Sequence, residues 1–129
     1  MKKVQLIVGI CLGVILMACQ TSPEATARSR NFNSDWKFNL GEVSGAASVT
    51  FDDTSWRSLN LPHDWAIEGN FDKNNPAGFN GGALPGGLGW YRKTFNMHES
   101  DKGKKVFVDF DGAYMKTTVY LNGDSIGFW

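Results

Sequence analysis

Hydrophobic and polar residues alternate with a period of two in several stretches of the chain beyond Asn31. Trp36, Phe38 and Leu40 share one face of the first such stretch, and polar residues separate them. This alternation is typical of a β-strand with one buried face. No window beyond Asn31 keeps apolar residues at helical spacing for three turns. The pattern therefore predicts a fold that is mostly β.

The same pattern predicts further strands along the chain. They cover residues 57–61, 90–95, 104–110, 115–121 and 125–129. In the 104–110 stretch, Val106, Val108 and Phe110 are expected to point inward, and residues 115–121 are expected to be its partner strand. Asn122-Gly123 predicts a two-residue type I′ hairpin, because both residues tolerate the positive φ that this turn needs. We expect about six or seven strands, where a closed jelly roll has about eight.

Two segments interrupt the alternation. Residues 51–56 contain Asp and Ser side chains of the kind that cap turns. Residues 78–89 hold six glycines in twelve positions, so we expect an irregular segment there. This glycine-rich segment lacks the lysine and the following Ser or Thr of a phosphate-binding loop.

The N-terminal residues have the pattern of an export signal. Lys2 and Lys3 precede an uncharged apolar stretch, Val4–Met17, which is shorter than the roughly 20 residues that span a bilayer. The end of this stretch resembles a bacterial lipobox, so cleavage before Cys19 would leave a lipid-modified N-terminus. The alternative is an ordinary signal peptide with a chance cysteine. Polar residues follow up to Arg30 and suit a tether.

These features predict three parts of the chain and its location. Residues 1–18 form the lipoprotein signal peptide, residues 19–30 the tether, and residues 31–129 a single β domain. The protein is expected in the cell envelope, anchored by lipid to a bacterial membrane on the outer-membrane or periplasmic side.

Charge and composition exclude several classes of function. The chain has 13 basic and 13 acidic side chains, so it lacks the basic excess of a nucleic-acid-binding protein. His63 and His98 stand apart from other potential ligands, which predicts no metal site and gives no reason to expect a cofactor. Five tryptophans suit a β-rich core or a sugar-stacking surface, and the core is the favoured interpretation.

Three blocks of the sequence together resemble one enzyme family. The blocks are LPHDWAIEG at 61–69, GGLGWYRKTF at 86–95 and FDGAYMKTTVYLNGDSIG at 110–127. In order and spacing they resemble the N-terminal sugar-binding domain of glycoside hydrolase family 2, especially its β-galactosidase branch. The resemblance implies a jelly-roll β-sandwich, incomplete at its C-terminal end in this chain.

The resemblance also implies how the full-length enzyme works. Its N-terminal domain packs against an immunoglobulin-like domain and a TIM barrel, and the barrel carries both catalytic glutamates. The enzyme would hydrolyse β-galactosides with retention, and its partner would be a carbohydrate. The acidic pairs Asp52–Asp53 and Asp109–Asp111 fit a turn and the polar face of a strand, so no catalytic residue is expected in this chain.

The stretch 61–69 allows two interpretations. His63 and Asp64 could form an acid/base pair, but neighbours on an extended chain point to opposite faces. The alternative is a structural corner in which Asp64 accepts hydrogen bonds from the following turn and Trp65 is an apolar anchor. The resemblance implies that His63, Asp64 and Trp65 help to form the wall of the substrate pocket.

The glycine-rich loop is the other place where sugar contact is expected. Some family members have a substrate-contacting asparagine where this chain has Gly86, and Asn80 is a candidate to replace it. Two other functions stay open: a free-standing carbohydrate-binding or adhesin lipoprotein, and a relative that acts on β-glucuronides or β-mannosides.

Overall fold

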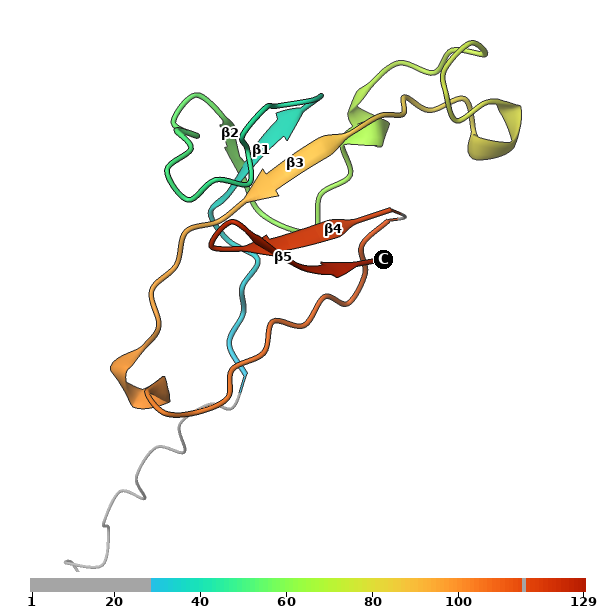
Figure 1. The fold of residues 1–129 in the computed structure, drawn as a ribbon. Coiled ribbons are helices and arrows are strands. Elements are labelled where there is room, and N and C mark those ends of the chain that lie inside the picture. Colours follow the sequence, from blue (N-terminus) through green and yellow to red (C-terminus); the bar gives the residue numbers. More distant parts are fainter. Residues whose placement is uncertain (1–28, 115) are drawn as a thin grey trace, which may run out of the picture. The chain divides into compact units, whose positions relative to one another are not determined.

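The computed structural model describes residues 29–114 and 116–129. The chain divides into two units, and the fold below is that of the larger one, Phe32–Trp129. Within the described ranges, the regular elements are β-strands and short 3-10 helices, without an α-helix (Figure 1). None of the described helices is long and apolar enough to cross a bilayer. The prediction of an all-β fold is confirmed.

Three strands form an antiparallel sheet. Strand β1 (Trp36–Leu40) lies in the middle, between β2 (Arg57–Leu59) and β3 (Gly89–Arg92). Phe38 pairs with Arg57 on one side and with Tyr91 on the other. The three strands lie where alternation predicted them, although β2 and β3 are shorter. Beyond β2, the N–H of Leu61 donates to the carbonyl of Asn33, just before β1, at 2.7 Å.

The buried apolar residues are few and lie beside this sheet. Phe38, Ala46 and Trp56 are at most 7% exposed, and the Phe51 ring lies 5.4 Å from that of Trp56. Trp56 thus agrees with the prediction that tryptophans belong to the core. Trp129 does not agree, since it is 85% exposed.

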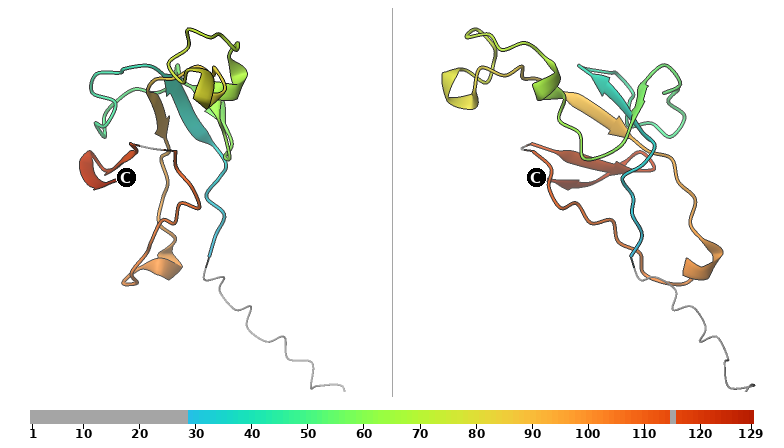
Figure 2. Two further views of the ribbon diagram at one scale, coloured as in Figure 1. Left: turned by 90° about the vertical axis from the view of Figure 1, so that its right-hand side faces the viewer. Right: turned by 180° about the vertical axis from the view of Figure 1, so that it is seen from behind.

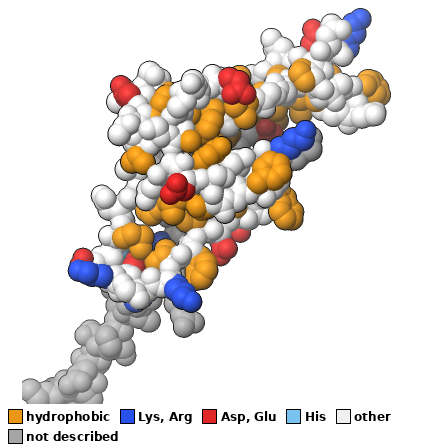
Figure 3. All heavy atoms as spheres, viewed as in Figure 1, with side chains coloured by type: hydrophobic (Ala, Val, Ile, Leu, Met, Phe, Trp, Pro, Cys, Tyr) orange, Lys and Arg blue, Asp and Glu red, His pale blue; other side chains and the backbone are white. Residues whose placement is uncertain are grey.

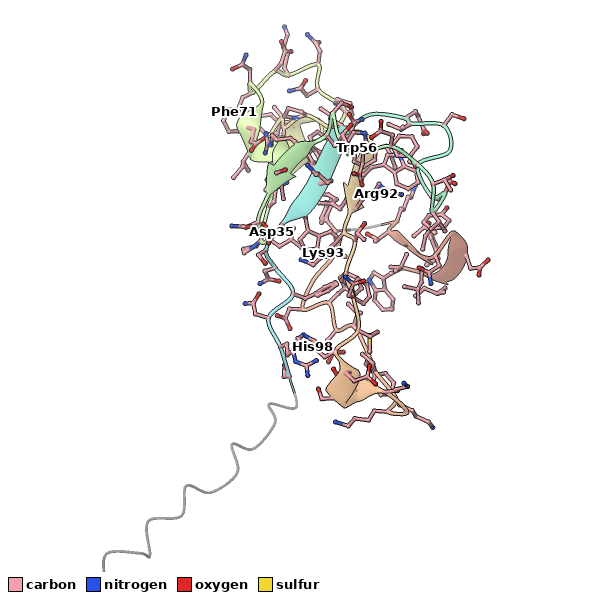
Figure 4. All side chains as sticks on the ribbon, turned by 90° about the vertical axis from the view of Figure 1, so that its left-hand side faces the viewer. Asp35, Trp56, Phe71, Arg92, Lys93 and His98 are labelled. Carbon is pink, nitrogen blue, oxygen red and sulfur yellow. The ribbon has the colours of Figure 1, made fainter. Side chains whose placement is uncertain are left out.

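Arg92 at the end of β3 fastens the connection between β1 and β2. Its Nε donates to Asp53 Oδ2 at 3.0 Å, and its Nη1 donates to the carbonyl oxygens of Ala46 and Ser48. The guanidinium carbon also lies 5.4 Å from the centre of the Phe51 ring. Figure 4 shows Arg92 on the same side of the sheet as Trp56. One side chain therefore holds the loop that covers the core.

A β-hairpin forms a second, separate sheet of two strands. Strand β4 (Thr118–Leu121) pairs with β5 (Asp124–Phe128), and Asn122 and Gly123 both have positive φ, 51° and 93°. The predicted hairpin at Asn122-Gly123 is confirmed.

The predicted strand at 104–110 is wrong. These residues follow the 3-10 helix η3 (Glu99–Asp101) without regular structure, and β4 pairs with β5 alone. A strand is defined by its ladder, and among the described residues the backbone of this segment pairs with no strand: the N–H of Lys104 donates back to Asp101 in the turn after η3, at 3.0 Å. The described ranges accordingly hold five strands and not six or seven. Met115, expected in the partner strand, lies outside the described residues.

Residues 69–88 connect the corner after β2 to β3 and are irregular, as the glycines predicted. They include one 3-10 turn, η2 (Phe79–Gly81). Figure 2 shows this loop, green to yellow, extending away from the start of β3.

Replacing Arg92 by Met tests the clamp. The stem of the side chain is kept, but Asp53 and two carbonyl groups lose their donor, so the free energy of unfolding should fall by about 2 kcal/mol. Lys102→Met is the control, because its ion pair with Glu99 is 80% and 86% exposed and should contribute less than about 0.5 kcal/mol. Urea denaturation measures both variants. Equal losses would contradict a clamp at Arg92.

Candidate functional site

The stretch 61–69 forms a tight corner between β2 and the glycine-rich loop. It contains the 3-10 helix η1 (Trp65–Glu68), and Asp64 is its N-cap. Asp64 Oδ1 accepts a hydrogen bond from the N–H of Ala66 at 3.0 Å. The carboxylate is thereby used to begin the turn, as the corner interpretation predicts.

His63 lies at the centre of a polar network. Its side chain is 9% exposed, and its Nδ1 lies 2.8 Å from the hydroxyl of Tyr91 on β3. Its Nε2 lies 2.6 Å from Arg57 Nη2 and 3.2 Å from Glu68 Oε1. Arginine has only donors, so the contact with Arg57 requires the lone pair of Nε2. With Nε2 as the acceptor, Nδ1 is the nitrogen that donates to the oxygen of Tyr91.

A bidentate ion pair closes the network. Arg57 Nη1 and Nη2 donate to the two carboxylate oxygens of Glu68 at 2.8 and 2.7 Å. These hydrogen bonds from Arg57 are the main cause that lowers the pKa of Glu68 to about 2. Burial raises the pKa of Tyr91, and the negative charges of Asp64 and Glu68 raise it further. At neutral pH the network contains an ionised Glu68 and a neutral phenol.

Aromatic packing holds the network against the sheet. The Phe38 ring lies 4.9 Å from both the His63 and the Tyr91 ring, and the Arg57 guanidinium carbon lies 5.5 Å from the Phe38 ring centre.

Trp65 packs against the first residue of β3. A β-carbon placed on Gly89 would lie 2.9 Å from Trp65 Nε1 and 3.1 Å from Phe38 Cε2, which is too close for a side chain. Glycine at this position lets the corner approach the sheet, so Trp65 is the apolar anchor that was predicted.

The two carboxylates of the corner are both used in local structure. A retaining enzyme needs a protonated carboxyl group and an ionised carboxylate about 5 Å apart. Glu68 is ionised and paired with Arg57, whereas Asp64 caps η1. His63 turns to Tyr91 and Arg57 and not to Asp64, so the pair of neighbours does not act together. The geometry supports a rigid structural corner.

The loop beyond the corner is fixed at its base. Asn75 Nδ2 donates to the carbonyls of Asn70 and Ala83 at 2.9 and 2.8 Å, and the N–H of Asp72 also donates to Ala83. Asn80 is exposed on η2 within this loop and is not a member of the His63 network. His63, Asp64 and Trp65 are consecutive residues of the corner, and Asn80 lies on η2 in the loop that follows.

Two other predictions concern the lipidated Cys19 and metal binding. Cys19 lies outside the described residues. The described part of the chain contains no group of three or more His, Cys, Asp or Glu side chains that could hold a metal ion.

Sequence reasoning did not find three members of the network: Arg57, Glu68 and Tyr91. Glu68 stands in the same stretch as His63, and the spacing of five residues was its only signal. Arg57 and Tyr91 reach the corner because both pair with Phe38 across the sheet, which alternation alone cannot show.

Comparisons with known proteins identify the family of the chain. The β-galactosidase BoGH2A of Bacteroides ovatus is 53% identical over 113 residues, which are 87% of this chain and 13% of that enzyme. The solved structure of a β-glycosidase from Bacteroides vulgatus matches 76% of this chain, and 13% of its own, with a TM-score of 0.73 and 44% identity. A glycosyl hydrolase family 2 member from Bacteroides cellulosilyticus matches 77% of this chain, and 14% of its own, with a TM-score of 0.72 and 35% identity.

The chain is thus a domain of glycosidase type, and its β fold is that of the matched segments. It belongs to glycoside hydrolase family 2, where it corresponds to the N-terminal domain. The chain spans 13% of the length of BoGH2A. Other relatives carry the name β-glucuronidase. No protein-family model matches the chain.

Replacing Glu68 by Gln tests the ion pair through the pH dependence of stability. Because folding lowers the pKa of Glu68 from 4.5 to about 2, its ionised form stabilises the fold above pH 4.5, and this contribution disappears as the pH falls through 2. The variant should lack this part of the decrease in unfolding free energy between pH 4.5 and 2.

Glu99→Gln is the matched control, since Glu99 is 86% exposed. In Glu99→Gln, the unfolding free energy should decrease between pH 4.5 and 2 as much as it does in the wild type. Superimposable stability curves for wild type and Glu68→Gln would contradict the assigned role of the pair.

Proposed function

We propose that this chain is the N-terminal domain of an exported, lipid-anchored β-galactosidase that hydrolyses β-galactosides with retention of configuration. The observation that carries the proposal is the 53% identity with the β-galactosidase BoGH2A over 113 residues. The domain would act as a scaffold and as one wall of the pocket, with His63, Asp64 and Trp65 at the corner and Asn80 on the loop. A β-galactoside-containing glycan is the expected partner.

The carboxylates of the described corner support a role without bond cleavage. Glu68 is paired with Arg57 and Asp64 caps η1, while Asp53 is paired with Arg92. Each of these groups stabilises local structure and would disturb it if it exchanged protons with a substrate. The catalytic carboxylates would accordingly belong to the rest of the enzyme, in the barrel that the family resemblance implies, beside an immunoglobulin-like domain.

Two alternatives to a β-galactosidase are a β-glucuronidase and a free-standing binding module. Relatives named β-glucuronidases, one of them 35% identical over 108 residues, make hydrolysis of β-glucuronides the second candidate. The comparisons give no support to a free-standing carbohydrate-binding or adhesin module, because the matches are segments of glycosidases.

Chromogenic substrates separate the two candidates. The product of the complete open reading frame that includes this sequence should hydrolyse a β-galactoside, with a kcat/KM at least about tenfold above that for the β-glucuronide. Residues 32–129 alone should show no turnover, because the corner lacks a free acid and base. A preference for the glucuronide, or turnover by residues 32–129, would contradict the proposal.

Replacing Cys19 by Ala tests the lipid anchor. Wild-type protein expressed in a Gram-negative host should incorporate labelled palmitate and enter the detergent phase on phase separation. Cys19→Ala should lose both properties, whereas Cys11→Ala, altered inside the apolar stretch, should keep them. Equal labelling of the two variants would contradict lipidation at Cys19.

A further inference from the structure

The loop after the corner is closed by its own hydrogen bonds. We call residues 70–83 the 70–83 loop. Asn75 Nδ2 donates to the carbonyls of Asn70 and Ala83 at 2.9 and 2.8 Å, and the N–H of Ala83 donates to the carbonyl of Gly78 at 2.7 Å. One amide group thus joins the two ends of the loop. Compact surface loops whose ends lie close together are frequently functional.

Close backbone packing fixes the shape of the 70–83 loop. A β-carbon placed on Gly81 would lie 2.8 Å from the β-carbon of Ala77, and one placed on Gly86 would lie 2.9 Å from that of Pro76. Side chains at these two glycines would push the segments apart. The loop is therefore held in one conformation, and a side chain that it presents is positioned before a ligand arrives.

Phe79 is the side chain that the loop presents most fully. It begins η2 and is 95% exposed, so its ring gains none of the free energy that burial of an aromatic side chain gives. Asn74 and Asn80 of the same loop are exposed as well. Figure 3, in the view of Figure 1, shows hydrophobic side chains exposed on this loop together with acidic and basic ones. The loop holds an aromatic ring in solvent among polar groups.

A flat apolar ring beside amide groups has the chemistry of a sugar-binding surface. The C–H groups on one face of a pyranose ring are apolar and pack on an aromatic face, and the sugar hydroxyls exchange hydrogen bonds with amides. A dry contact with another protein surface would instead remove water from the polar side chains of the loop, which is costly. These polar side chains include Asp72, Lys73, Asn74 and Asn80. The surroundings of Phe79 therefore favour a carbohydrate as its partner.

We propose that Phe79 is the stacking platform for a sugar ring on the leaving-group side of the scissile bond, so that the 70–83 loop selects galactosides attached to a further saccharide. The proposal rests on the proposed function, which assigns Asn80 of this loop to the pocket. The carboxylates of the corner are used in local structure, so the cleaved galactose lies with catalytic groups from the rest of the enzyme. Binding energy from a sugar beyond the reacting bond lowers the barrier when the contact is kept in the transition state.

Substrate length tests the platform in the product of the complete open reading frame. The readout is the ratio of kcat/KM for a linear trisaccharide with a terminal β-galactose to kcat/KM for methyl β-galactoside. Phe79→Ala should lower this ratio about tenfold, because only the trisaccharide has a further sugar ring to lose from the aromatic face. Phe107→Ala removes another ring, 81% exposed, and should change the ratio by less than about twofold. An unchanged ratio in Phe79→Ala, or an equal fall in both variants, would overturn the platform.

Two conservative variants test whether a flat ring is needed. Phe79→Tyr keeps the aromatic face and should keep the ratio of the wild type. Phe79→Leu keeps an apolar side chain without a flat face and should lower the ratio as Phe79→Ala does. A packing contact with another part of the protein would give a different result: Phe79→Leu would keep the ratio, and Phe79→Ala would lower the melting temperature. That result would overturn the platform in favour of a domain contact.

The platform and the proposed function fail in different measurements. A wild-type enzyme that hydrolyses β-galactosides and whose ratio is unaffected by Phe79→Ala would keep the proposed function and overturn the platform. A wild-type enzyme that hydrolyses β-glucuronides instead would remove the proposed function. The same ratio, measured with a glucuronide-terminated trisaccharide and methyl β-glucuronide, would then decide the platform, and a fall in Phe79→Ala but not in Phe107→Ala would support it.

Discussion

The packing of Phe38 against its neighbours is the contact on which the described structure depends. Phe38 is 6% exposed in the middle strand of the three-stranded sheet, and its ring contacts those of His63 and Tyr91. Gly89 has no side chain, and this leaves room beside it for both Trp65 and the Phe38 ring. The corner, the central strand and β3 therefore share one apolar centre, and the polar network is built around its edge.

This arrangement gives Glu68, Arg57 and Tyr91 a structural role at the corner. Proton transfer at neutral pH requires a group that can change its charge at little cost. The pKa of Glu68 is held near 2 by Arg57, and burial raises the pKa of Tyr91 above its ordinary value. Both shifts make proton exchange at neutral pH harder. At neutral pH Glu68 therefore stays ionised and Tyr91 stays neutral, which suits groups that hold the corner against the sheet.

The features that the sequence predicted correctly depend on neighbouring residues. The hairpin at Asn122-Gly123 follows from backbone φ preferences, and the cap at Asp64 follows from the side chain and its own turn. The network needed strand pairing as well, since Arg57 and Tyr91 meet His63 from two different strands. Alternation reports which face of a strand is apolar but not which strand lies beside it. The 104–110 prediction failed for this reason, because its alternation is present without a partner.

The two sheets differ in how much of their surface is buried. The three-stranded sheet has a buried centre and the Arg92 clamp, whereas the hairpin contacts it through Trp90, whose ring stacks on Tyr120 with 5.9 Å between centroids. The indole N–H of Trp90 is buried without a hydrogen-bond acceptor among the described residues. The hairpin therefore meets the three-stranded sheet at an aromatic contact, whereas the corner and its network are carried by the strands of the three-stranded sheet.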